Sequence, residues 1–153
     1  MASSRGSIRE SETIVTAYPI LVVEDEFLIA LDIVAALERL KSRYKLVILS
    51  NGDRDMLKAA GPHIGFPFDL VISVQEAGYF KPHWKTYAKA EELIGHHRSN
   101  CLFVANHAFD CIGAKSYGMR TAFIDRRKRP FGETPHRPDL IVANFAELAA
   151  ELC

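Results

Sequence analysis

The chain has 153 residues, of which 48% are hydrophobic and 25% charged, and 19 basic side chains balance 19 acidic ones. This length suits one globular domain with a real core, and the balanced charge gives no electrostatic footprint for nucleic acid. The longest apolar runs are too short to span a bilayer. We read the basic run Arg126-Arg127-Lys128-Arg129 as a solvated loop rather than a phosphate clamp.

The ends and the cysteines bear on domain organisation and compartment. Residues 1–18 lack the apolar stretch of a secretory signal, so we expect a flexible N-terminal tail followed by a single domain at 19–153. Cys101, Cys111 and Cys153 are odd in number and lack metal-ligand spacing. This pattern predicts free thiols in a cytoplasmic protein.

Short apolar runs alternate with segments of helical periodicity along the rest of the chain. In chain order, the predicted elements are a strand at 20–23, a helix at 27–43, a strand at 46–49, a helix that starts from the N-cap Asp53 and stops at Gly61-Pro62, a strand at 70–73, a helix with Pro82 in its first turn that runs to Gly95, a strand at 101–104, a helix at 108–117, strands at 121–124 and 140–142, and a helix at 145–152. Aromatic residues of these helices are expected in the core, namely Trp84, Tyr87 and Phe109.

Strands that alternate with helices of this length predict an α/β fold, a three-layer, doubly wound parallel sheet of the Rossmann-like type. In such a sheet, ligands bind at the carboxyl ends of the strands. The polar residues that follow the predicted strands are Glu24, Asp25 and Glu26, then Ser50 and Asn51, then Lys81, and then Asn106, His107 and Asp110. A carboxylate beside a lysine, with hydroxyl and amide donors nearby, is an arrangement suited to nucleophilic catalysis.

Three of these segments resemble one known family. Leu49-Ser-Asn-Gly52, Phe80-Lys-Pro-His83 and Asn106-His-Ala-Phe-Asp110 together resemble the core domain of the haloacid dehalogenase (HAD) superfamily, most of all its 2-haloacid dehalogenase branch, over residues 35–152. The resemblance implies a hydrolase of small molecules whose Asp nucleophile forms a covalent ester with the substrate. It implies these roles: Asp25, Lys81 and Asp110 as catalytic residues, and Ser50, Asn51 and Asn106 as substrate-binding residues.

The resemblance also bears on cofactors. Asn106 stands where the family's phosphatases carry an acidic Mg²⁺ ligand, and the dehalogenase branch, which works without a metal, has a neutral residue there. We therefore expect no cofactor, since a hard cation prefers more carboxylate oxygens. The alternative is a weak metal site formed by Glu24, Asp25 and Asp110.

The first motif departs from the family pattern. After Asp25 the family has a Gly-Thr pair, which is replaced here by Leu28 and Ile29, and only one helix intervenes before Ser50, which leaves no cap domain. Residues 19–40 instead resemble the start of a response-regulator receiver domain, which suggests a chimera. We therefore expect an impaired, cap-less hydrolase, and the alternative is a catalytically inactive chimeric or remnant domain with at most weak metal or anion binding.

Each candidate residue also has a purely structural interpretation. Glu24 and Asp25 suit the N-terminal end of the helix at 27–43 through its dipole, and Asp110 suits the cap of a helix at 111–117. Phe66-Pro67-Phe68, with the uncovered sheet edge, is a candidate homodimer surface.

Overall fold

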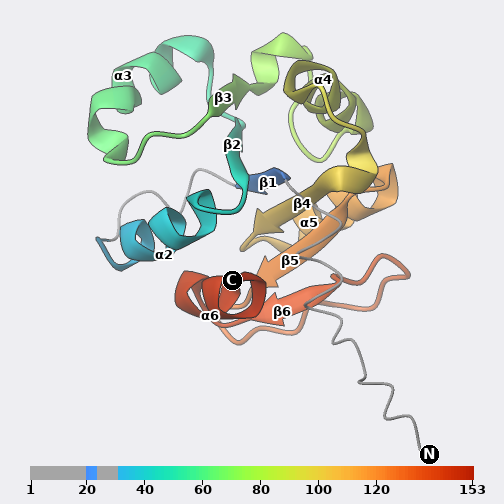
Figure 1. Cartoon of the computed structure of the whole chain (residues 1–153). Coiled ribbons are helices and arrows are strands. Elements are labelled where there is room, and N and C mark those ends of the chain that lie inside the picture. Colours follow the sequence, from blue (N-terminus) through green and yellow to red (C-terminus); the bar gives the residue numbers. More distant parts are fainter. Residues whose placement is uncertain (1–19, 24–30) are drawn as a thin grey trace, which may run out of the picture.

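A computed structural model describes residues 20–23 and 31–153. In this part of the chain six parallel strands form one sheet in the order β3-β2-β1-β4-β5-β6 (Figure 1). The strands are β1 (Ile20–Val23), β2 (Lys45–Ser50), β3 (Leu70–Ser73), β4 (Cys101–Ala105), β5 (Arg120–Ile124) and β6 (Leu140–Val142). The helices are α2 (Leu31–Lys41), α3 (Arg54–Ile64), α4 (Trp84–Ile94), α5 (Ala108–Tyr117) and α6 (Phe145–Leu152), with short 3₁₀ turns η2 (Val74–Glu76) and η3 (Arg98–Asn100).

The strand order places the first strand in the middle of the sheet. Val22 of β1 pairs with Val47 of β2 on one side and with Phe103 of β4 on the other. The chain runs outward from β1 to β3 and then returns to β4, so the strand order reverses between β1 and β4. In open parallel sheets this reversal marks the crevice where ligands bind.

Two apolar clusters cover the two faces of the sheet and follow the two-residue period of its strands. On one face Leu46 and Leu102 pack with residues of α2 and α6. On the other face Val47 and Phe103 pack with residues of α4 and α5. The helices thus lie on both sides of the sheet (Figure 1), and the predicted three-layer α/β fold is confirmed.

Helix α3 is longer than the sequence predicts. Its N-cap is Asp53 as expected, because the Asp53 carboxylate accepts the backbone N–H of Met56 at 2.8 Å. The predicted stop at Gly61-Pro62 is wrong, since the helix continues through Pro62 to Ile64 and ends at Gly65 with φ 70°. A proline in the last turn leaves only one carbonyl, that of the exposed Lys58, without its helical partner, and water can satisfy it.

Helix α4 begins later than the sequence predicts. Pro82 lies in the loop before it and is joined to Lys81 by a cis peptide bond. The N-cap is His83, whose Nδ1 accepts the backbone N–H of Lys85 at 3.2 Å. The helix ends at Gly95 as predicted.

Two aromatic residues expected in the core are on the surface. Trp84 is 58% exposed and Phe109 is 47% exposed, whereas Tyr87 is fully buried as predicted. Both exposed rings lie in the first turns of α4 and α5, beyond the carboxyl edge of the sheet, so no strand covers them.

Several other predictions concern ends and surfaces. Phe66 lies in the core and Phe68 packs against it, which leaves only Pro67 of the predicted dimer surface exposed. All three cysteines are free. No helix among the described residues is both long and apolar enough to cross a membrane. The expected tail at 1–18 lies outside the described residues, as do residues 24–30 of the receiver-like segment at 19–40.

Candidate active site

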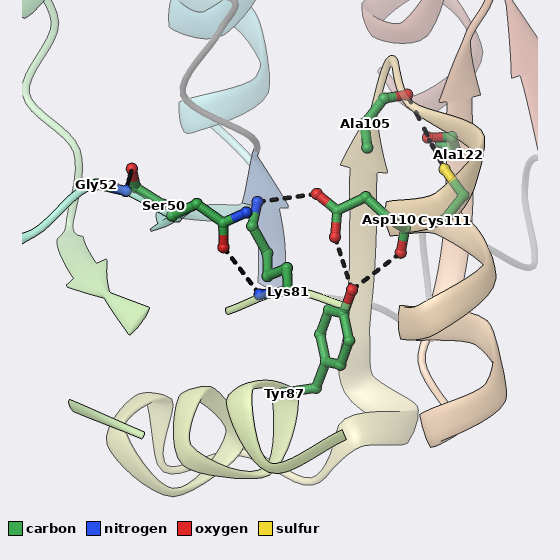
Figure 2. A network of polar contacts seen from close by, with 9 residues as sticks. Ser50, Gly52, Lys81, Tyr87, Ala105, Asp110, Cys111 and Ala122 are labelled. Atoms are coloured by element: carbon green, nitrogen blue, oxygen red, sulfur yellow. Dashed lines mark hydrogen bonds and ion pairs between the residues drawn. The ribbon is translucent and has the colours of Figure 1, made fainter. Parts of the chain in front are cut away.

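A buried ion pair lies at the carboxyl edge of the sheet. Lys81 Nζ donates to Asp110 Oδ2 at 2.8 Å, and the two side chains are 2% and 0% exposed (Figure 2). The Lys81 ammonium also lies 5.7 Å from the ring centroid of Phe103, which adds a cation–π contact. Two charges are buried at this depth only when they are paired, because each loses its hydration. The pair therefore fixes the loop before α4 to the first turn of α5.

Tyr87 supports the carboxylate of this pair from α4. Its phenol oxygen lies 2.6 Å from Asp110 Oδ1 and 3.2 Å from the Asp110 carbonyl oxygen (Figure 2). Both carboxylate oxygens of Asp110 thus accept a hydrogen bond, one from Lys81 and one from Tyr87. The sequence predicted Tyr87 only as a core residue. A polar role could have been inferred, because a phenol on the buried face of a helix needs a hydrogen-bond partner.

Gly113 lets α5 approach the Lys81 loop closely. A Cβ atom at this position would lie 2.6 Å from Pro82 Cβ and 2.7 Å from the Tyr87 phenol oxygen. Only a residue without a side chain fits between the helix and the loop. The sequence offered no signal for this role, because the contact joins segments about 30 residues apart.

The loop after β2 is linked to the Lys81 segment through the backbone. Asn51 Oδ1 accepts the backbone N–H of Lys81 at 2.8 Å, and the buried Ser50 Oγ accepts the backbone N–H of Gly52 at 2.9 Å (Figure 2). The Gly52 carbonyl in turn accepts from Ser73 Oγ at 2.7 Å. The three predicted segments that follow β2, β3 and β4 therefore meet at one place.

Asp110 does not serve as a helix cap. Helix α5 begins at Ala108, and its N-cap position is His107, whose side chain makes no capping hydrogen bond. The alternative that Asp110 merely caps a helix at 111–117 is wrong, because its carboxylate lies inside the first turn and points to Lys81.

Of the remaining predicted site residues, the structure describes Asn106 but not Glu24 or Asp25. Asn106 directly follows β4 and is half-buried, at the same edge as Ser50. Glu24 and Asp25 lie outside the described residues. Within the described part of the chain no three His, Cys, Asp or Glu side chains are grouped closely enough to hold a metal ion.

The sequence and the fold of this chain match those of known proteins. The family model for haloacid dehalogenase-like hydrolases matches residues 5–118. The chain belongs to the haloacid dehalogenase-like hydrolases.

Individual haloacid dehalogenase relatives are similar over most of this chain. An (S)-2-haloacid dehalogenase from Pseudomonas putida is 32% identical over 121 residues, which is 77% of this chain and 53% of that relative. A solved dehalogenase structure with an intermediate complex is 29% identical with a TM-score of 0.75, over 80% of this chain and 56% of that one.

A second solved structure contains a covalently bound acid. It is the L-2-haloacid dehalogenase of Xanthobacter autotrophicus with chloropropionic acid covalently bound, 32% identical with a TM-score of 0.68, over 76% of this chain and 58% of that one. The present chain therefore spans little more than half the length of the relatives it matches.

Proposed function

We propose that this domain carries the hydrolytic chemistry of a 2-haloacid dehalogenase. A carboxylate oxygen of Asp25 displaces the halide from C2 of the substrate, so that a C–O bond forms as the carbon–halogen bond breaks. Water then hydrolyses the resulting ester, which gives a 2-hydroxy acid and restores the carboxylate. The observation that carries the proposal is the buried Lys81–Asp110 pair at the switch point of the sheet, in a chain whose relatives include a dehalogenase with covalently bound substrate acid.

The register of the sheet supports Asp25 as the nucleophile. Val23 pairs with Ile48 and with Val104. Ser50 and Asn106 each follow those partners by two residues, and Asp25 follows Val23 by the same number.

The described residues have distinct roles in this proposal. Lys81 orients the nucleophile and compensates its charge, and Asp110 holds Lys81 in place with the help of Tyr87. The side-chain oxygen of Asn51 accepts the backbone N–H of Lys81, which leaves its NH₂ group to donate. This NH₂ group, together with Ser50 and Asn106, donates to the substrate acid or the departing halide. No step requires a metal ion.

A second candidate is a folded domain without turnover. It is favoured by the replacement of the family's Gly-Thr pair by Leu28 and Ile29, and by the exposed Trp84 and Phe109 rings at an edge that a lid would cover. Without a lid, water reaches the site and weakens the electrostatic stabilisation there.

Halide release from 2-chloropropionate separates the two candidates. The wild type should release chloride in metal-free buffer, Asp25→Asn should not, and Glu151→Gln, at an exposed position in the last turn of α6, should match the wild type. Mass spectrometry of the intact protein should detect the ester in the wild type alone. If folded wild type and Asp25→Asn release no chloride and carry no ester, the dehalogenase proposal fails and the second candidate stands.

A further inference from the structure

A small basic pocket opens beside the candidate active site, between the start of α5 and the loop after β5. It has a volume of about 170 Å³. Its polar lining consists of Asn106, His107, Asp125, Arg126, Arg127 and Arg129. We name it the arginine pocket. Asn106 belongs both to this pocket and to the proposed active site, so the two are adjacent.

The loop that carries the arginines is held in a defined turn. The backbone N–H of Asp125 donates to the Val142 carbonyl at 2.8 Å, which fixes the start of the loop to β6. The Asp125 carboxylate accepts the backbone N–H of Arg129 at 3.2 Å, and Lys128 between them has φ 49°. The turn therefore folds back on itself, which brings Arg127 and Arg129 to the same pocket.

At this edge of the sheet some of the described basic side chains form ion pairs and others do not. Lys81 is paired with Asp110, and Arg54 is paired with Glu76 at 2.6 Å. Within residues 20–23 and 31–153, by contrast, the side chains of Arg127 and Arg129 form no ion pair. Among the described residues of the pocket lining, Asp125 is the single carboxylate, and it accepts a backbone hydrogen bond. The described lining thus carries more positive than negative side chains.

We propose that the arginine pocket binds an oxyanion of the substrate, so that the preferred substrate is a haloacid with a second acidic group. This inference rests on the proposed function of the adjacent site. Guanidinium groups bind carboxylate and phosphate oxygens through paired hydrogen bonds, which a lone ammonium does not offer. A volume of about 170 Å³ admits a carboxylate or a phosphate group.

Binding measured without turnover tests the inference. Isothermal titration at one fixed ionic strength would compare succinate, inorganic phosphate and propionate on the full chain. Arg127→Gln/Arg129→Gln should weaken succinate binding by about tenfold for each arginine removed. The control is Arg39→Gln/Arg43→Gln, which removes two exposed arginines at the opposite edge of the sheet and should leave binding unchanged.

The outcomes distinguish this inference from the proposed function. Arginine-dependent binding of succinate, with propionate much weaker, supports a dicarboxylate. The same dependence for phosphate alone supports the pocket with a phosphate as its oxyanion. Equal binding to the double variant and the wild type overturns the inference. If no haloacid is turned over while succinate still binds through the arginines, the pocket stands and the dehalogenase proposal falls.

Discussion

At the scale of single residues, Lys81 and Asp110 form the most deeply buried ion pair of the described residues. Both side chains are almost fully buried, and Lys81 Nζ lies 2.8 Å from Asp110 Oδ2. A buried pair of this kind adds little net stability, but removing one partner leaves an uncompensated charge in the core. The pair therefore holds Lys81 in position and does not stabilise the fold.

This asymmetry can be measured. Lys81→Met should lower the free energy of unfolding by about 3–5 kcal/mol, because it leaves the Asp110 carboxylate buried without its cation. Lys81→Met/Asp110→Leu should recover most of that loss while remaining inactive. Denaturant unfolding at pH 7 gives both values. A double variant no more stable than Lys81→Met would contradict the account.

Gly113 makes a second prediction at this scale. Gly113→Ala should destabilise the fold by about 1–3 kcal/mol and reduce turnover, since its Cβ would press on Pro82 and Tyr87 and displace the Lys81 loop. Gly61→Ala is the control, because beyond its chain neighbours an added Cβ meets nothing within 4 Å, and the gain in helix propensity is offset by the following Pro62. Thermal and denaturant unfolding should show a clear loss of stability for Gly113→Ala and little change for Gly61→Ala.

Sequence reasoning succeeded for some residues of the site and not for others. Ser50, Asn51, Lys81 and Asp110 were predicted from polar residues at strand ends and from the family resemblance, and the structure brings all four to one place. Their catalytic roles remain predictions. Tyr87 and Gly113 were not predicted, because their contacts depend on how closely α4 and α5 approach each other.

At the scale of elements, Asp139 joins the loop before β6 to α5 and β5. Its carboxylate accepts from Lys115 Nζ at 2.6 and 2.7 Å, from Arg120 at 2.8 Å and from the Thr121 backbone N–H at 2.9 Å. Burial alone would raise the pKa of Asp139, but these hydrogen bonds, led by that from Lys115, together hold the pKa below its usual value. The ionised form is thus favoured in the folded state.

The pH dependence follows from that direction. A carboxyl group with a lowered pKa contributes stability above its unfolded pKa of about 3.9, and the contribution is lost as the pH falls through the lower folded value. Asp139→Asn should therefore cost about 2 kcal/mol at pH 7, and the gap to the wild type should close under acid. Urea unfolding at pH 7 and pH 3 checks this. A gap that is the same at both pH values would show that the charge does not matter.

The strand and helix order was predictable because apolar periodicity reflects burial, which the sheet dictates. The helix boundaries were less so. Pro62 was taken as a stop, but a proline in a solvent-exposed last turn costs only one hydrogen bond. Pro82 was placed in the first turn of α4. The helix instead begins at Trp84, because the His83 side chain caps it by accepting the backbone N–H of Lys85.

At the scale of the whole molecule, the carboxyl edge of the sheet carries exposed aromatic rings. Phe80 and Trp84 are 69% and 58% exposed, and Trp84 is the chain's sole tryptophan. The rings of His83 and Tyr79 stack beside it with centroids 4.1 Å apart. These rings form an exposed apolar rim beside Lys81 of the candidate active site.

The single tryptophan reports on that rim directly. Fluorescence of the native protein should be quenched strongly by iodide at low protein concentration, because more than half of Trp84 is exposed to water. Unfolding should change the quenching little. Protection that increases with protein concentration would instead show that a second copy covers the rim, and sedimentation measurements would give its stoichiometry.

The central position of β1 also governs how the chain folds during synthesis. Of the six described strands this one is synthesised first, but one of its two neighbours, β4, ends at Ala105, more than 80 residues later. Until then an apolar strand has one unpaired edge, which invites aggregation. A nascent chain halted before β4 should bind chaperones and resist folding, and release of the rest of the chain through α6 should let it fold.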